Sequence, residues 1–276
     1  MNLFEETQML LNQYGLRANK KLGQNFLINQ QIIDEIVEKA EISKEDIVLE
    51  IGPGLGSLTK ALLKSAKKVI AVELDENMIS LLQNRFENEN LEIIHEDILK
   101  LDLFAIAEKY GKIKVVANLP YYITTPIIMR LLEEKYPIET ITVMVQKEVG
   151  ERLCAEAGKR EIGAVTFGVN YYSKVKMIID VPKENFLPAP EVDSCVLRFD
   201  ILQEPPVKVK DEKRFFRLIK AAFTQRRKTI SNSLASGEFN KEEIAQVLAE
   251  LGIDSKLRAE DLSLQDYANL INTLLK

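Results

Sequence analysis

The chain has 276 residues and a mass of 31.4 kDa, with 46% hydrophobic and 29% charged residues and a formal net charge of −5. This composition is that of an ordinary globular protein and excludes a mostly disordered chain. No apolar run approaches the roughly 18 residues of a membrane-spanning helix, and no basic segment precedes an apolar stretch at the N-terminus. We therefore expect neither a membrane span nor a signal peptide.

The scarcest residues limit the possible chemistry. The chain has two cysteines, Cys154 and Cys195, and a single histidine, His95. Two distant cysteines indicate reduced thiols in a cytoplasmic protein, and together with one histidine they lack the spacing of a metal site. We expect no bound metal. A lone histidine at the end of an apolar run is more often structural than catalytic, so the reaction should not need an imidazole base.

The first half of the chain predicts a parallel sheet. A short helix and a basic loop lead to a helix that begins after Asn29, a good N-cap residue. The expected strands that follow are Ile47–Ile51, Lys68–Glu73, Leu91–His95, Lys114–Asn118 and Thr140–Gln146. The expected helices are Ser57–Ser65, Asn77–Phe86, Phe104–Tyr110, Pro126–Glu134 (capped by Thr125) and Lys147–Ala157. Strands that alternate with helices of this length are typical of βαβ units.

The second half of the chain predicts a different order of strands and helices. Lys174–Val181 and Ser194–Asp200 predict two strands joined by a proline-containing loop, which would close the sheet with an antiparallel pair. Two prolines in residues 203–206 mark a linker. Helices are expected at Lys213–Phe223, Lys228–Ala235, Lys241–Leu251 and Ser263–Leu275. We thus expect an α/β domain over residues 1–202 and a small helical domain over residues 203–276.

Positive charge gathers near the C-terminus. Residues 207–234 hold nine basic and two acidic residues, a net charge of +7, which leaves −12 for the rest of the chain. Such an asymmetry suggests a local contact with a polyanion, although a solvated helix face would explain it equally well.

A glycine-rich turn follows the first expected strand of the sheet. Residues 50–56, Glu-Ile-Gly-Pro-Gly-Leu-Gly, join a buried strand to a helix, where doubly wound sheets bind nucleotides. The dinucleotide fingerprint would need glycine or alanine where Ser57 stands. Glu73 ends the next strand and suits a carboxylate that accepts hydrogen bonds from both ribose hydroxyls. The pattern favours S-adenosylmethionine over NAD, with a glycine turn that binds nothing as the remaining alternative.

A second motif lies at the same edge of the expected sheet. Residues 118–121, Asn-Leu-Pro-Tyr, follow the fourth strand. The lone pair of an exocyclic adenine amine is delocalised into the ring and must be localised before the nitrogen attacks a sulfonium methyl. An amide oxygen and a backbone carbonyl can accept the two N–H bonds and favour a tetrahedral nitrogen, while Tyr121 can stack on the base. Alone, this motif would indicate only a strand-to-turn transition.

Several segments together give a specific family resemblance. The matching segments are residues 21–27 (KLGQNFL), 50–56 (EIGPGLG), 118–121 (NLPY), 186–192 (FLPAPEV), 225–229 (QRRKT) and 258–263 (RAEDLS). From about Lys20 to the C-terminus, the sequence closely resembles the ribosomal RNA adenine dimethyltransferases of the KsgA/RsmA type. The resemblance implies a Rossmann-like class I methyltransferase sheet, mostly parallel with an antiparallel last strand, and a small all-helical C-terminal domain that binds RNA.

The resemblance also implies a role for each matching residue. The S-adenosylmethionine pocket would be lined by Asn25, Leu27, Gly52, Glu73, Asp97 and Asn118. Glu73 would bind the ribose hydroxyls of the cofactor, and Asp97 its adenine amino group. The target amine would be held by Asn118 and the Leu119 carbonyl, and the target adenine would stack on Tyr121 and Phe186. Taken alone, Asp97 would rather cap a turn and Phe186 would rather be core.

The substrate that the resemblance implies is small-subunit (16S) rRNA within an immature 30S particle. Two adjacent adenosines in its 3′-terminal hairpin loop would each receive two methyl groups, with a role in small-subunit biogenesis. Phosphate contacts that position this RNA are expected from Lys20, Lys21, Arg226, Arg227 and Lys228. We expect a monomer that does not bind membranes.

Three alternatives remain at this point. A macrolide-resistance methyltransferase of large-subunit rRNA would share the glycine loop and the Asn118 motif, although residues 258–263 favour the small-subunit enzyme. A protein that acts mainly as a non-catalytic ribosome-assembly factor would need neither motif intact. An NAD oxidoreductase is the weakest alternative.

Overall fold

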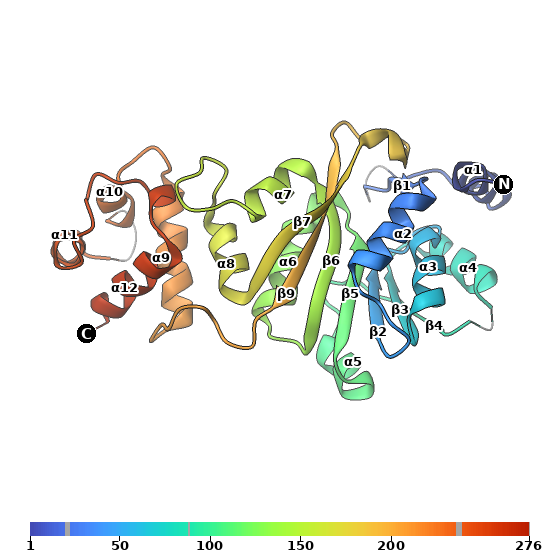
Figure 1. The fold of residues 1–276 in the computed structure, drawn as a ribbon, viewed down its shortest axis with the longest axis horizontal. Coiled ribbons are helices and arrows are strands. Elements are labelled where there is room, and N and C mark those ends of the chain that lie inside the picture. The colour runs from blue at the N-terminus through green and yellow to red at the C-terminus, as the bar shows by residue number, and fades with distance from the viewer. Residues whose placement is uncertain (20–22, 88, 236–238, 276) are drawn as a thin grey trace. The chain divides into compact units, whose positions relative to one another are not determined.

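The computed structural model describes residues 1–19, 23–87, 89–235 and 239–275 (Figure 1). The chain forms two compact units, Met1–Gly150 with Val175–Ile201, and Glu151–Lys174 with Leu202–Lys276. This division differs from the expected boundary after residue 202, because residues 151–174 group with the C-terminal helices. Within this second unit, the Phe167 ring packs edge-on against Tyr267 with 5.0 Å between centroids.

The first unit is built on a seven-stranded sheet with the order β4-β3-β2-β5-β6-β9-β7. The strands are β2 (Ile47–Ile51), β3 (Lys68–Glu73), β4 (Leu91–His95), β5 (Ile113–Asn118), β6 (Ile138–Gln146), β7 (Ser173–Val181) and β9 (Ser194–Ile201). The pairs from β4 to β6 are parallel, whereas β9 is antiparallel to β6. The expected, mostly parallel sheet is confirmed, with antiparallel β9 between β6 and the edge strand β7. The strand order reverses between β2 and β5, which is where such sheets place their ligands.

Helices connect the parallel strands and precede the sheet. They are α1 (Leu3–Gln13), α2 (Gln30–Lys39), α3 (Ser57–Ser65), α4 (Glu76–Arg85), α5 (Leu103–Tyr110), α6 (Thr124–Glu133) and α7 (Lys147–Leu153). Asn29 caps α2 as predicted, because its side chain accepts a hydrogen bond from the Gln31 backbone N–H at 3.0 Å. The prediction that Thr125 caps α6 is wrong. A 3₁₀ turn, η2 (Tyr121–Ile123), runs directly into this helix, and the Thr124 hydroxyl donates to the Pro120 carbonyl at 3.0 Å.

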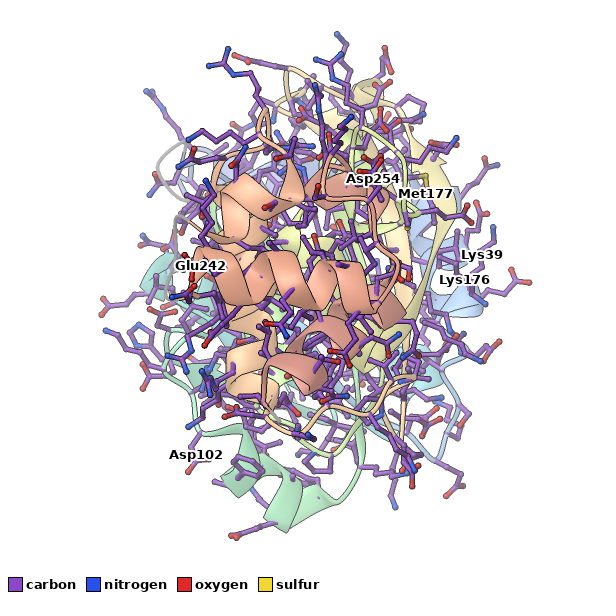
Figure 2. All side chains as sticks on the ribbon, turned by 90° about the vertical axis from the view of Figure 1, so that its left-hand side faces the viewer. Lys39, Asp102, Lys176, Met177, Glu242 and Asp254 are labelled. Atoms are coloured by element: carbon purple, nitrogen blue, oxygen red, sulfur yellow. The ribbon has the colours of Figure 1, made fainter. Side chains whose placement is uncertain are left out.

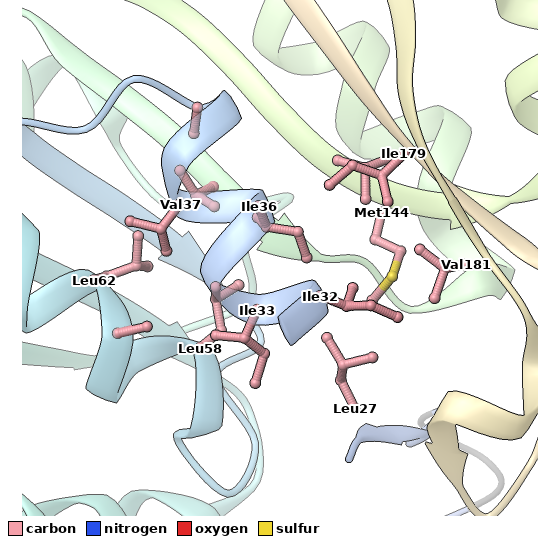
Figure 3. Close-up of a cluster of buried hydrophobic side chains, with 14 of the residues drawn as sticks. Leu27, Ile32, Ile33, Ile36, Val37, Leu58, Leu62, Met144, Ile179 and Val181 are labelled. Carbon is pink, nitrogen blue, oxygen red and sulfur yellow. The ribbon is translucent and has the colours of Figure 1, made fainter. Parts of the chain in front are cut away.

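The hydrophobic core lies where α2 and α3 cover the sheet (Figure 3). Ile33 and Ile36 of α2 are 0% and 3% exposed and belong to one buried cluster with Leu58 and Leu62 of α3. Their spacing on α2 is that of a single helical face, and the helix buries this face against its neighbours. Strand β2 is buried at all five positions because it lies inside the sheet. The core thus holds the end of β2 in a fixed position.

A buried arginine ties β9 to the end of α2. The Arg198 guanidinium donates to the Lys39 carbonyl at 2.7 Å and to the Glu41 carboxylate at 2.6 Å. The hydrogen bond with Arg198 lowers the pKa of the Glu41 carboxyl group. Figure 2 labels Lys39 at the end of α2 and Lys176 on β7, on the same side of the first unit. This contact joins segments more than 150 residues apart and anchors the antiparallel strand.

The second unit is helical. Its helices are α8 (Ala164–Tyr172), α9 (Glu212–Thr224), α10 (Ile230–Leu234), α11 (Lys241–Glu250) and α12 (Leu264–Leu274). The sequence did not predict α8, because six of its nine residues are buried and it lacks an amphipathic pattern. Helix α10 begins two residues later than predicted, since a turn with a bond from the Lys228 N–H to the Gln225 carbonyl precedes it. Within the described residues, every helix is too short or too polar to cross a membrane.

Candidate active site

A large pocket opens at the carboxyl ends of the central strands of the first unit. The empty space between its lining residues is about 1190 Å³, a volume that includes open solvent at the entrance. The segment before α2, the glycine loop and the residues after β3, β4 and β5 line it. The pocket brings together eight of the nine predicted cofactor and catalytic residues, namely Asn25, Leu27, Gly52, Glu73, Asp97, Asn118, Leu119 and Tyr121.

The glycine loop needs its glycines for two different reasons. Gly52, Gly54 and Gly56 have φ values of +67°, +54° and +81°, a region that other residues rarely adopt. A Cβ on Gly52 would meet no atom within 4 Å, so this glycine leaves open space at the pocket. A Cβ on Gly56 would lie 2.6 Å from the ring of Phe86 on the opposite side of the loop. Gly52 therefore makes room for a ligand, whereas Gly56 lets the loop pack against the protein.

Glu73 is a fixed and buried carboxylate. It is 7% exposed and accepts backbone N–H bonds from Gly54 at 3.2 Å, from Leu74 at 2.8 Å and from Asp75 at 2.9 Å. Burial raises the pKa of this carboxyl group, and the three N–H bonds oppose that effect. A carboxylate has about four acceptor sites, so the three N–H bonds leave one, on Oε2, for a ribose hydroxyl.

Asp97 both stabilises a turn and lines the pocket. Its Oδ1 accepts the backbone N–H of Leu99 at 2.9 Å and thereby stabilises the turn after β4. The same residue lines the pocket next to Ile98, a buried apolar neighbour. An acceptor beside an apolar surface suits the amino edge of a purine.

Asn118 has a defined orientation. Its Nδ2 donates to the backbone carbonyl of Asn25 at 3.1 Å. Because a carbonyl can only accept, this bond assigns the NH₂ group to the N-terminal segment and leaves Oδ1 as an acceptor on the other side. The segment before α2 therefore sets which end of the Asn118 amide is available for a substrate.

Tyr121 is also held in place by a partner far along the chain. Its hydroxyl lies 2.7 Å from the Ser194 hydroxyl, and Ser194 at the start of β9 is 0% exposed. Burial raises the pKa of Tyr121, so the phenol is neutral near pH 7. The next residue, Tyr122, is 56% exposed and also lines the pocket. Two neighbouring aromatic residues thus line the pocket.

Phe186 does not lie where the sequence predicted it. Its ring is 2% exposed and belongs to the core cluster that also contains Leu27. Strand β8 (Phe186–Leu187) pairs with β1 (Phe26–Leu27), and the ring is buried beside this short antiparallel ladder and does not line the pocket. In this structure Phe186 is a core residue, and no stacking role is assigned to it.

Two residues have no role predicted from the sequence, yet one lines the pocket and the other contacts Tyr121. Glu50 lines the pocket and is 1% exposed, and its Oε2 has no hydrogen-bond partner within the described part of the chain. Burial raises the pKa of Glu50 to about 8. Its place as the first residue of the glycine motif was a usable signal. Ser194 gave no signal, since only the tertiary structure brings it to Tyr121.

The remaining predicted residues lie elsewhere. The Arg226 guanidinium donates to the carbonyls of Arg160 at 2.6 Å and Ile162 at 3.0 Å within the helical unit, so it has a structural function there. Arg227 and Lys228 are exposed. Lys20 and Lys21 lie outside the described residues.

His95 and the two cysteines lie outside the pocket. His95 ends β4, is exposed and does not line the pocket. Cys154 and Cys195 form no disulfide. Over the described ranges, no cluster of His, Cys, Asp and Glu side chains could hold a metal ion.

Comparisons with known proteins place the chain in a family. The model of the ribosomal RNA adenine dimethylase family matches residues 15–276. A relative from Clostridium botulinum (strain Kyoto / Type A2), named ribosomal RNA small subunit methyltransferase A, is 48% identical over 265 residues, which are 96% of each chain. A protein of the same name from Geobacillus kaustophilus is 46% identical over 97% of this chain and 94% of its own length.

Solved structures show the same fold. A dimethyladenosine transferase from Plasmodium falciparum superposes with a TM-score of 0.76 at 29% identity, covering 89% of this chain and 95% of its own. The 23S rRNA methyltransferase ErmE gives 0.72 at 25% identity, covering 91% and 100%. A 23S rRNA methyltransferase thus shares this fold, whereas the relatives at 46% and 48% identity are named small subunit methyltransferases. This chain belongs to the ribosomal RNA adenine dimethylase family.

Proposed function

We propose that the chain transfers methyl groups from S-adenosylmethionine to the exocyclic amines of two adjacent adenosines in small-subunit rRNA. The product at each position is N6,N6-dimethyladenosine, and the substrate is the 3′-terminal hairpin loop in an immature 30S particle. The names of the relatives support the RNA, and the orientation of the Asn118 amide supports the reaction.

The pocket suits S-adenosylmethionine in shape and charge. Glu73 would take a ribose hydroxyl, Asp97 would take the amino edge of the cofactor's adenine, and Gly52 leaves room for close approach. Asn25 and Leu27 close the pocket from the N-terminal segment. When bound, the cofactor supplies a methyl group made electrophilic by a positively charged sulfur.

On the side of the pocket that would hold the target adenine, hydrogen-bond acceptors rather than a general base would act on the amine. Asn118 Oδ1 and the Leu119 carbonyl would accept the two N–H bonds of the target amine and hold its lone pair toward the methyl group. These acceptors gain strength as positive charge develops on the nitrogen, so they stabilise the transition state more than the ground state. Tyr121 would stack on the target adenine, and its link to Ser194 fixes the ring. The proton leaves only after transfer, so no strong base is required.

Substitution of Asn118 tests this proposal. We predict that Asn118→Ala lowers the single-turnover rate of methyl transfer by about 10²–10³-fold while S-adenosylmethionine binding stays within a few-fold of the wild type. The matched control is Asn84→Ala, an exposed amide on α4 outside the pocket, which should keep the wild-type rate. A rate in Asn118→Ala equal to that of the control would contradict the assigned role.

A further inference from the structure

Glu50 has properties that the proposed reaction does not use. Its carboxyl group is 1% exposed at the end of β2, and Oε2 lacks a hydrogen-bond partner among the described residues although it lines the pocket. A buried carboxylate without full hydrogen bonding is costly, so this arrangement calls for a ligand or a proton.

The charges around Glu50 are of one sign. The pocket lining contains the carboxyl groups of Glu50, Glu73, Glu96 and Asp97, and no lysine or arginine among the residues that the structure describes. The neighbours of Glu50 across β2 are the apolar Ala71 on β3 and Val116 on β5.

The groups that act on Glu50 oppose each other. From α3, a hydrogen bond from the Thr59 backbone N–H favours the ionised form, whereas the Thr59 hydroxyl has no hydrogen-bond partner within the described part of the chain. From β3, the negative charge of Glu73 disfavours it. Burial is the largest influence and raises the pKa of Glu50 to about 8, so the carboxyl group holds a proton at neutral pH.

The two ligands that the pocket must exchange differ in charge. S-adenosylmethionine has a sulfonium, an ammonium and a carboxylate group, a net charge of +1, whereas the product S-adenosylhomocysteine has a neutral thioether. We infer that Glu50 discriminates the cationic methyl donor from its neutral product by giving up its proton to solvent when the donor enters. This inference rests on the proposed function, because it takes the pocket as the site of the donor. An acidic pocket with one carboxyl group close to its titration point responds to a single charge of this kind.

The sign of the pH dependence follows directly. The protonated carboxyl group must ionise to pair with the donor, so donor affinity rises with pH between 6 and 8, by at most about tenfold per pH unit. Above pH 8 the carboxyl group is already ionised and donor affinity levels off. The product keeps the ammonium and carboxylate groups but has lost the sulfonium charge that Glu50 would balance, so we expect product affinity to stay flat.

Calorimetric titration of the full chain tests this inference. S-adenosylmethionine and S-adenosylhomocysteine are each titrated from pH 6 to pH 9 in two buffers of different ionisation enthalpy, which reports the protons released. We expect the wild type to release close to one proton with the donor at pH 7 and none with the product.

The isosteric variant Glu50→Gln isolates the carboxyl group. We expect it to bind the product as the wild type does, which also shows that it folds, and to lose both the proton release and the pH slope for the donor. An amine of the donor that changes protonation would do so in the variant too, so the difference between the two proteins belongs to Glu50. If the variant binds neither ligand, the proton count of the wild type decides.

Two results would overturn the inference in distinguishable ways. Binding of both ligands to the wild type with equal proton release and parallel pH profiles would refute the role of Glu50 alone. Failure of the wild type to bind S-adenosylmethionine at any pH would refute the proposed function and this inference with it.

Discussion

A hydrogen bond between two hydroxyls restrains Tyr121, the residue that we propose stacks on the substrate base. The Ser194 hydroxyl is buried and 2.7 Å from the phenol oxygen, so it restrains the ring without contacting the pocket itself. Ser194 is thus a positioning residue, and Tyr121 is the residue that would touch the base.

We predict that Tyr121→Phe and Ser194→Ala each lower the rate of methyl transfer by about 3- to 10-fold, the value of one hydrogen bond. The double variant should be no slower than either single variant, since both remove the same bond. Tyr121→Ala should lose more, because stacking on a base contributes about 1–3 kcal/mol. Single-turnover rates at saturating and subsaturating RNA separate these effects. Additive losses in the double variant would show that the two hydroxyls act independently.

At the scale of single residues, the sequence predicted the residues whose chemical role is evident from the short motif that contains them. Asn118, Gly52 and Glu73 lie in the pocket because each ends or directly follows a parallel strand, and these strand ends share one edge. Ser194 and the true place of Phe186 depend on which distant strands pair, which local pattern does not reveal.

At the scale of the element, two glycines of the glycine loop have different structural roles. Gly56 begins α3 and lies against Phe86 and Leu82 at the end of α4, whereas Gly52 faces open space in the pocket. The same substitution at the two glycines should therefore have different consequences.

We predict that Gly56→Ala lowers the free energy of unfolding by about 2–4 kcal/mol, because the new Cβ overlaps the Phe86 ring and the backbone is strained. Gly52→Ala should cost only the strain, about 1–2 kcal/mol, but should weaken S-adenosylmethionine binding at least tenfold. Urea unfolding and calorimetric titration of both variants give the two quantities. Equal unfolding free energies for the two variants would contradict the packing role of Gly56.

The strands and helices of the sheet were predictable because periodicity and capping agree there. The expected bounds of β2, β3, β4 and α3 are those of the structure. Helix α8 was missed because burial on most sides removes the amphipathic signal, and α6 begins early because η2 leads into it. Local pattern thus failed where tertiary packing overrides it.

At the scale of the whole molecule, the basic segment near the C-terminus is the main candidate for RNA contacts. The three consecutive basic residues 226–228 are all exposed, yet they differ in their partners. Arg226 donates to two backbone carbonyls, which makes it part of the helical unit's structure.

We predict that Arg227→Ala and Lys228→Ala each flatten the log–log salt dependence of RNA binding by about 0.7–0.9. Arg226→Ala should instead lower the free energy of unfolding by about 1–2 kcal/mol, with a smaller change in the salt slope. Filter binding over a salt series and urea unfolding measure the two effects. A salt slope that stays unchanged in both Arg227→Ala and Lys228→Ala would mean that these two side chains face solvent and do not contact the RNA.

The most direct test of the proposed function uses isolated ribosomal subunits that lack the modification. Labelled S-adenosylmethionine is incubated with the protein and with small or large subunits separately, and the RNA is then digested to nucleosides. We predict label in N6,N6-dimethyladenosine from the small subunit alone, and none with Asn118→Ala. Label in large-subunit RNA, or binding to small subunits without any transfer of label, would contradict the account.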